Sequence, residues 1–343
     1  MLRNIIFTFC VLFSGFYSEA QDIHFSQLAQ TPLLINPSST GLYDGFYRAN
    51  LNYKNQWTAM GKPYRTFMGS FDMPVIIRTR QNTANLGIGA FLFYDNAGES
   101  NYSTTQFNVC FSGIVPTGEF HKLSVGIGAG IVYNSFDISD IQWPNQYNGQ
   151  SYDPALPSNE TGFSKSLFSF DLAAGVQYHM MKQLRAVKEK EIVCFNLGAA
   201  IFHVTKPVQH YSGWYRERVY PRIVFHSSFR YDFRNTGVGI VPALLYMWQG
   251  PSKEFDAEIL VRFRTGKKTN YTGFFTESAV FAGLHYRHKD ALSPMVLFEI
   301  SDFGLGISYD INISSFSRAT KMKGGLEISV YYAKMKGLHY KNH

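Results

Sequence analysis

The most constraining feature of this sequence is an alternation of side-chain character that recurs along most of its 343 residues. Residues 123–134 show it best, because apolar side chains occupy every second position and serine, asparagine or glycine fill most positions between them. Successive side chains of a β-strand point to opposite faces, whereas a helix repeats about every 3.6 residues. The period of two therefore predicts strands with one face that needs apolar surroundings.

About 14 such segments occur along the chain. They lie near residues 47–54, 64–73, 86–92, 106–112, 123–134, 168–178, 193–201, 222–231, 237–248, 255–265, 279–287, 295–300, 304–313 and 325–332. An even number of long strands is typical of a transmembrane antiparallel up-and-down β-barrel and places both chain ends in the periplasm. We therefore predict an all-β fold of this kind. Alternation is poor over 238–248 and 295–300, so the sequence does not determine which residues of these two strands face outward.

Composition agrees with strands that face lipid on one side and a polar interior on the other. Only 17% of residues are charged, against about 25% in soluble domains, yet the mean hydropathy is -0.14. A helical membrane bundle would be more apolar, because each span needs about 20 apolar residues. The formal charge of +7 is dispersed, so we expect no nucleic-acid partner.

The chain divides into four predicted parts. Residues 1–20 have the layout of a signal peptide, with Arg3 before an apolar stretch and a small-residue cleavage site between Ala20 and Gln21. Residues 21–46 lack alternation and are expected as an irregular segment at the periplasmic mouth, partly inside the barrel. Residues 47–332 form the barrel, and residues 333–343 form a C-terminal tail.

Three residues of the segment 21–46 restrict its backbone. Pro37 fixes φ, Asn36 can close a local side-chain turn, and Gly41 can adopt a positive φ. The leucines and the isoleucine nearby need apolar cover, which the barrel mouth or a periplasmic partner can supply. We therefore predict one defined path for this segment.

Charged residues on the strands fall on the face opposite the apolar one. An arginine against lipid at mid-membrane costs about 2–4 kcal/mol, so these side chains are predicted to face the lumen. They are Arg48, Lys54, Asp171, Arg230, Glu258, Arg262, Arg264, His285, Arg287, Asp310 and Glu327. We expect them to form interior ion pairs and to be candidate contacts for a partner. Glycines on the same face leave room for a segment to approach the wall closely.

Two connections without alternation, residues 138–165 and 203–220, are the longest. Long loops of outer-membrane barrels are extracellular, and both fall on the same predicted side. Cys110 and Cys194 fall on strands that are not neighbours, which rarely brings two cysteines close enough for a disulfide.

No arrangement of residues predicts catalysis. The 10 histidines form no H-E-x-x-H motif or cysteine–histidine cluster. The glycines of 126–130 lie within an alternating run and precede no predicted helix, so they do not indicate a nucleotide loop. We assign no catalytic residue, no metal site and no cofactor.

Both ends of the chain carry uncommon residues in a fixed order. Asp22, His24-Phe25-Ser26-Gln27, Pro32-Leu33, Ile35-Asn36-Pro37, Thr40-Gly41, Tyr47-Arg48 and Asn55-Gln56-Trp57 resemble the opening of the PorP/SprF family of outer-membrane proteins. Tyr286-Arg287, Asp290-Ala291, Gly306, Tyr309-Asp310, Ser314-Ser315, Gly325 and Glu327 resemble its terminal pattern. The centre of the chain matches in pattern only.

The resemblance implies a role in type IX secretion and gliding motility. Such a protein would retain a secreted cargo protein with a C-terminal sorting domain at the cell surface, or link it to the secretion machinery, while embedded in outer-membrane lipid. The alternative is a diffusion channel for hydrophobic solutes of the long-chain fatty-acid transporter type, which has a similar strand number and a leading plug. Reconstitution in bilayers separates the two, because only the channel conducts solute steadily.

Overall fold

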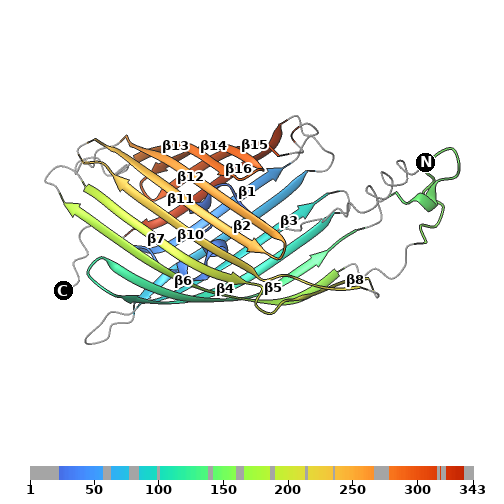
Figure 1. The fold of residues 1–343 in the computed structure, drawn as a ribbon, viewed down its shortest axis with the longest axis horizontal. Helices are drawn as coiled ribbons and strands as arrows, with labels where there is room; N and C mark the ends of the chain where they lie inside the picture. The colour runs from blue at the N-terminus through green and yellow to red at the C-terminus, as the bar shows by residue number, and fades with distance from the viewer. Residues whose placement is uncertain are drawn as a thin grey trace, which may run out of the picture.

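The computed structural model is a closed barrel of fourteen antiparallel strands, with the N-terminal segment inside it (Figure 1). It describes residues 23–56, 63–76, 85–98, 101–137, 142–159, 166–185, 190–212, 215–234, 236–265, 278–314, 317 and 322–335. The predicted signal peptide, with its cleavage site at Ala20 and Gln21, and the tail from residue 336 lie outside these ranges.

Each barrel strand pairs with two neighbours. The strands are β1 (Gly45–Gln56), β2 (Tyr64–Ile76), β3 (Asn85–Ala97), β4 (Tyr102–Pro116), β5 (His121–Ser135), β6 (Ser166–Arg185), β7 (Lys190–Phe202), β10 (Arg222–Asp232), β11 (Val238–Gln249), β12 (Ser252–Arg264), β13 (Ser278–Arg287), β14 (Ala291–Ile300), β15 (Phe303–Asn312) and β16 (Lys323–Met335). The barrel closes between β1 and β16, from Gly45 opposite Met335 to Gln56 opposite Gly325. The predicted strand number and up-and-down order are confirmed.

The two ends of the barrel differ in their connections. We call the end where β1 begins and β16 ends the base end, and the opposite end the loop end. The long connections 136–165 and 203–221 both lie at the loop end. The second contains a two-stranded hairpin that alternation did not predict, β8 (Val208–Ser212) and β9 (Tyr215–Arg218). Long loops of outer-membrane barrels are extracellular, so we expect the loop end to be the outer one.

Several strands extend beyond their predicted bounds. A charged turn was expected over 182–191, but β6 continues to Arg185, which lies opposite Lys190 of β7. Likewise β1 begins at Gly45 and β16 ends at Met335. Outside the lipid a strand no longer needs an apolar face, so alternation stops before the backbone pairing does.

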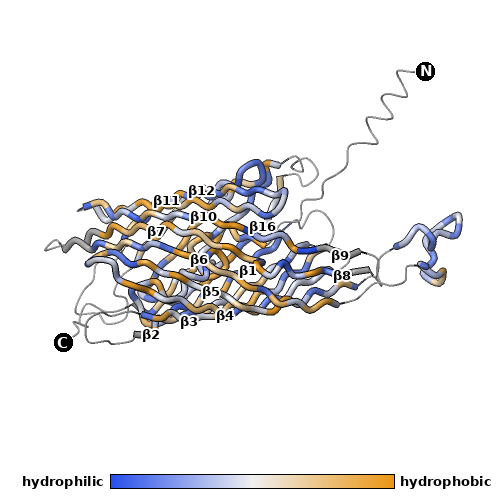
Figure 2. Tube along the Cα trace, turned by 60° about the horizontal axis from the view of Figure 1, so that its bottom comes forward, coloured by the Kyte–Doolittle hydropathy of each residue, from blue (hydrophilic) through white to orange (hydrophobic). Residues whose placement is uncertain are grey.

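The outward faces are apolar and exposed. Leu51 is 63% exposed and Ile127 is 60% exposed, and Figure 2 shows hydrophobic and hydrophilic positions alternating along the strands. Removing such surface from water is favourable by roughly 25 cal/mol per Å², so a lipid surrounding fits this face. Within the described ranges, no helix has the length and apolar character needed to span a membrane.

We call residues 23–44 the lumen segment. It contains three short helical turns, η1 (Leu28–Gln30), α2 (Pro32–Ile35) and η2 (Pro37–Ser39), which lie within the barrel in Figure 1. It starts at the loop end, where Lys54 donates a hydrogen bond to the His24 carbonyl, and reaches the base end, where Asp44 pairs with Lys122. The segment was expected at the mouth and only partly inside; it instead runs along the lumen.

Apolar burial explains this path. One cluster of buried residues joins the segment to the first strands: Phe25, Leu33 and Leu34 with Met68, Phe91, Phe93 and Cys110. A second joins it to the opposite wall: Leu28 with Ala200, Phe202, Val224 and Leu245. The inward face of β11 and the middle of the inward face of β14 are themselves apolar, so alternation alone could not show which residues of these strands face the lumen. Both strands pair with their neighbours in one defined register.

Candidate functional site in the barrel lumen

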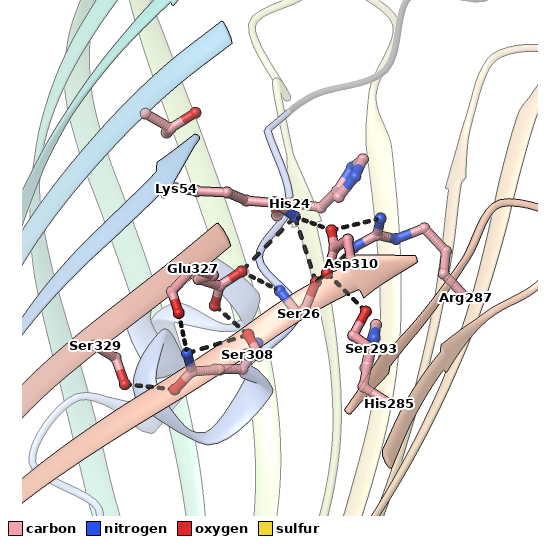
Figure 3. Close-up of polar contacts among 12 residues, drawn as sticks. His24, Ser26, Lys54, His285, Arg287, Ser293, Ser308, Asp310, Glu327 and Ser329 are labelled. Carbon is pink, nitrogen blue, oxygen red and sulfur yellow. Dashed lines mark hydrogen bonds and ion pairs between the residues drawn. The ribbon is translucent and has the colours of Figure 1, made fainter. Parts of the chain in front are cut away.

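The lumen segment is held at the loop end by a buried carboxylate of β16. The backbone N–H of Ser26 donates to Glu327 Oε2 at 2.8 Å, and the backbone N–H of Gln27 donates to Oε1 at 3.0 Å. Figure 3 shows Glu327, Asp310 and Arg287 directed toward Ser26 from the wall. Hydrogen bonds to an ionised acceptor are about twice as strong as neutral ones, so Glu327 fixes the position of this backbone.

Asp310 of β15 is the second anchor. Its Oδ1 accepts hydrogen bonds from the hydroxyls of Ser26 at 2.7 Å and Ser293 at 2.6 Å. Its Oδ2 lies 3.2 Å from Lys54 Nζ. Lys54 Nζ also lies 3.7 Å from Glu327 Oε2, so one lysine links both carboxylates.

Arg287 of β13 completes this loop-end latch, which we define as Lys54, Arg287, Asp310 and Glu327 around Ser26 and Gln27. Its Nη2 donates to Ser26 Oγ at 3.2 Å. Its Nε lies 3.3 Å from Glu254 Oε1, and its Nη1 lies 3.0 Å from Asp290 Oδ2. Removing two charges from water costs several kcal/mol per ion, which only multiple partners offset. Each cation of the latch has such partners.

Three further groups surround the latch. Glu258 accepts a 3.4 Å hydrogen bond from the Leu28 N–H, and His285 is fully buried with Nε2 3.9 Å from Asp256 Oδ1. Burial first, and then the charges of Arg287 and Lys54, hold the pKa of His24 well below its ordinary value. His24 is therefore neutral near pH 7, and its 3.5 Å approach to Glu254 is not an ion pair.

Asn36 fixes the middle of the segment. Its Oδ1 accepts from the Ser38 N–H at 2.9 Å, which caps η2 and closes the predicted side-chain turn. Its Nδ2 donates to the Val176 carbonyl at 3.1 Å and lies 3.0 Å from His226 Nε2. One amide thus joins the turn before Pro37 to strands β6 and β10.

The segment leaves the lumen at the base end through Gly41. This residue has a φ of +66°, which glycine adopts without strain, and its N–H donates to Asp72 Oδ2 at 2.7 Å. Arg48 binds the same carboxylate through Nε and Nη2, both at 2.9 Å. Asp72 therefore couples the segment to both β1 and β2.

Inward glycines form the surface on which the segment lies. A Cβ added at Gly126 would meet Ser38 backbone atoms at 2.5 Å, and one at Gly87 would meet the Thr40 carbonyl oxygen at 2.1 Å. A Cβ at Gly175 would lie 2.1 Å from Asn36 Oδ1. The close approach that these glycines allow is made by the chain's own N-terminal segment.

The remaining charged residues form separate groups. Asp171 Oδ2 lies 3.0 Å from His203 Nδ1. Arg230, Arg262 and Arg264 gather near the base end around Asp232. The structure thus brings Lys54, Glu258, His285, Arg287, Asp310 and Glu327 together and places Arg48, Asp171 and the three arginines elsewhere.

Sequence reasoning did not select several partners of these charges. They are Ser26, Gln27, Asp72, Asp232, Glu254 and Asp256. Asp256 does fall on the polar face of an alternating run, and Asp72 falls in a segment predicted as a strand. The sequence alone could therefore have identified both as candidate lumen residues. Which of them meets the lumen segment depends on barrel closure, which periodicity does not encode.

The arrangement binds a peptide segment through backbone and side-chain contacts. Among the described residues, no group of three His, Cys, Asp or Glu side chains could hold a metal ion. Cys110 and Cys194 are both free thiols, on β4 and β7, which are not neighbours.

Comparison with known families decides the wider assignment. The sequence pattern described as type IX secretion system membrane protein PorP/SprF matches residues 17–332. The chain belongs to this family. The match includes the lumen segment and almost all of the barrel, so the resemblance at the two ends extends across the centre. This PorP/SprF protein is an outer-membrane β-barrel.

Solved structures similar to the PorP/SprF chain share little sequence with it. The CymD monoaromatic hydrocarbon channel is 13% identical, with a TM-score of 0.45 over 92% of this chain and 95% of that one. The β domain of the Bordetella autotransporter Brka is 8% identical, with a TM-score of 0.42 over 86% and 100%. A TodX monoaromatic hydrocarbon channel mutant is 8% identical, with a TM-score of 0.40 over 89% and 94%. No curated protein matches.

Proposed function

We propose that this barrel is a non-enzymatic component of type IX secretion and gliding motility. It retains a secreted protein with a C-terminal sorting domain at the cell surface, or links that protein to the secretion machinery. The family match over residues 17–332 carries this proposal. Two features of the barrel support it, namely the lumen segment and the long loop-end connections.

The lumen segment favours a holding role over a conducting one. It is joined to β1, β2, β6, β10, β13, β15 and β16 by the contacts of Lys54, Asp72, Asn36, Ser26 and Gln27. A path for solute would require these buried charges to separate, which is costly without replacement partners. The barrel is therefore a fixed platform in its resting state.

The alternative function is a diffusion channel for hydrophobic solutes. It would require the lumen segment to move aside or to leave a continuous apolar path beside it. The apolar inward faces of β11 and β14 are the features that favour this second candidate.

A pull-down and a bilayer experiment separate the two. Affinity-tagged barrel purified from the native outer membrane should bring with it a surface protein that carries a C-terminal sorting domain, and it should stay closed in a planar bilayer. Steady uptake of a hydrophobic solute into proteoliposomes, without any co-purifying protein, would contradict the proposal and favour the channel.

A further inference from the structure

Three arginines converge on a single carboxylate at the base end of the lumen. Asp232 Oδ2 lies 3.2 Å from Arg230 Nη2, 3.7 Å from Arg262 Nη1 and 3.8 Å from Arg264 Nη2. Gly239 of β11 lies between Asp232 and Arg262 in the strand register. A Cβ at Gly239 would meet Asp232 Oδ1 at 2.4 Å, so the glycine lets the carboxylate lie across β11 toward β12.

Arg262 is poorly satisfied by this arrangement. Its side chain is only 7% exposed, and its Nε has no hydrogen-bond partner within the described part of the chain. A guanidinium carries five N–H donors, and buried donors are nearly always paired. Its 3.7 Å contact with Asp232 exceeds hydrogen-bond distance, and the Phe281 ring, 5.7 Å away, supplies no lone pair.

No described residue around the cluster accepts a hydrogen bond from Arg262 Nε. Leu260, Phe281 and Leu297 form an apolar floor beside the cluster. Among the described residues Glu299 also lies in this layer, because the register aligns Arg264, Ala279 and Glu299, and it accepts a hydrogen bond from the Tyr331 hydroxyl.

The cluster can be reached from the base mouth. Side-chain exposure is 28% for Arg230 and 15% for Arg264. Arg264 is the last residue of β12, and Arg230 lies two residues before the end of β10. All three arginines face the lumen, so the lipid around the barrel does not contact them. A ligand must therefore enter from the aqueous side.

We propose that Arg230, Arg262 and Arg264 form a docking site for acidic side chains of a protein partner that approaches the base end. A planar guanidinium pairs with a carboxylate through two parallel hydrogen bonds, which is the interaction Arg262 lacks. The apolar floor accommodates nonpolar residues flanking the acidic ones. This inference deepens the proposed function, because it names a contact through which a partner is held.

The binding test uses the full barrel in detergent and a fluorescent hexapeptide of alternating Asp and Glu. Wild-type barrel should bind it with an affinity that falls as salt rises. The double variant Arg262→Gln/Arg264→Gln should bind at least about tenfold more weakly, since charge-assisted hydrogen bonds are lost. Lys253→Gln, an exposed position on the same strand at the loop end, should bind as wild type does. If the double variant fails to assemble, Arg230→Gln replaces it.

Two results would overturn the site. One is equal peptide affinity for wild type and the arginine variants, and the other is displacement of the peptide by an equal concentration of inorganic phosphate, which would assign the cluster to phosphate ligands. A pull-down separates this failure from that of the proposed function. If the variants retain the same co-purifying proteins as wild type does, the docking site is wrong and the proposed function stands. If wild type retains no partner, the proposed function itself fails.

Discussion

Lys54 Nζ and Asp310 Oδ2 lie 3.2 Å apart, although both side chains are almost fully excluded from solvent. The two residues come from β1 and β15, on either side of β16. Because the Ser26 hydroxyl donates to the same carboxylate, the pair fixes the lumen segment as well as the barrel wall.

Replacing Lys54 with methionine should destabilise the barrel by about 3–5 kcal/mol, because two buried carboxylates lose their shared cation. Denaturant unfolding in detergent measures the change. Lys334→Met is the matched control, since Lys334 is 47% exposed and pairs with Asp302 at the surface. The control should leave stability nearly unchanged, because exposed ion pairs contribute little. Equal effects would show that the latch adds nothing beyond a surface pair.

Gly126→Ala should displace the lumen segment, because the new Cβ would lie 2.5 Å from Ser38 backbone atoms. Overpacking of this kind costs about 1–3 kcal/mol. Unfolding midpoint and bilayer conductance are the measurements, and conductance should rise. Gly113→Ala is the control, because a Cβ at Gly113 meets nothing within 4 Å. Indistinguishable behaviour of the two variants would mean that the segment does not lie against β5.

Deleting residues 21–40 should leave an assembled barrel that conducts small ions and no longer retains its partner. The strand ladders contain none of residues 23–40, and water can replace their contacts to Glu327 and Asp310. Heat-modifiable gel mobility reports assembly, and bilayer current reports closure. A truncated protein that stays closed and holds its partner would reduce the segment to a passive leader.

The start of the lumen segment should be accessible from outside the cell, because it lies at the loop end, whereas the strand number alone had placed both chain ends in the periplasm. Ile23 precedes His24, which contacts residues at the loop end, whereas Asp44 lies at the base end. In a Cys110→Ser/Cys194→Ser background, Ile23→Cys should react with a membrane-impermeant maleimide on intact cells. Asp44→Cys should react only after the outer membrane is opened. The reverse labelling pattern would place the loop end in the periplasm.

His24 should make stability depend on pH. Its pKa is held below the ordinary value of 6.5 by burial first, then by Arg287 and Lys54. Below about pH 6.5 the unfolded chain binds a proton that the folded chain does not, so stability falls as pH falls, by up to about 1.4 kcal/mol per unit. Glu254, Asp310 and His285 also face this site, so the readout is the difference in unfolding free energy between wild type and His24→Gln. Parallel pH profiles would contradict the assignment.

Local periodicity predicted the barrel well because lipid imposes one simple rule on every strand. The outward positions from Leu51 to Leu326 must be apolar, and each strand displays this independently of the others. Alternation predicted strand faces less well where the inward face is apolar too, as at Leu245 and Leu297. It predicted strand ends less well where strands leave the lipid, as at Arg185.

The lumen was harder to predict because its contacts join residues that are remote in sequence. Alternation placed Glu327 on the polar face, yet its partner Ser26 follows only from the closed ring. The pairing of Arg48 with Asp72 needs the register between β1 and β2, which alternation does not give either. The glycines at 87 and 126 did indicate a close approach. They could not indicate that the approaching chain was residues 37–41.

The lumen segment also constrains the order of assembly. It is continuous with β1, and it contacts β1, β15 and β16 across the seam where the sheet closes on itself. The bond between Ser26 and Glu327 spans 301 positions of the chain, and such remote contacts form late because loop closure is costly in entropy. If the ring closed first, the free N-terminus would have to thread a completed cylinder. A segment that already lies on the open sheet before the ring closes avoids this topological obstacle.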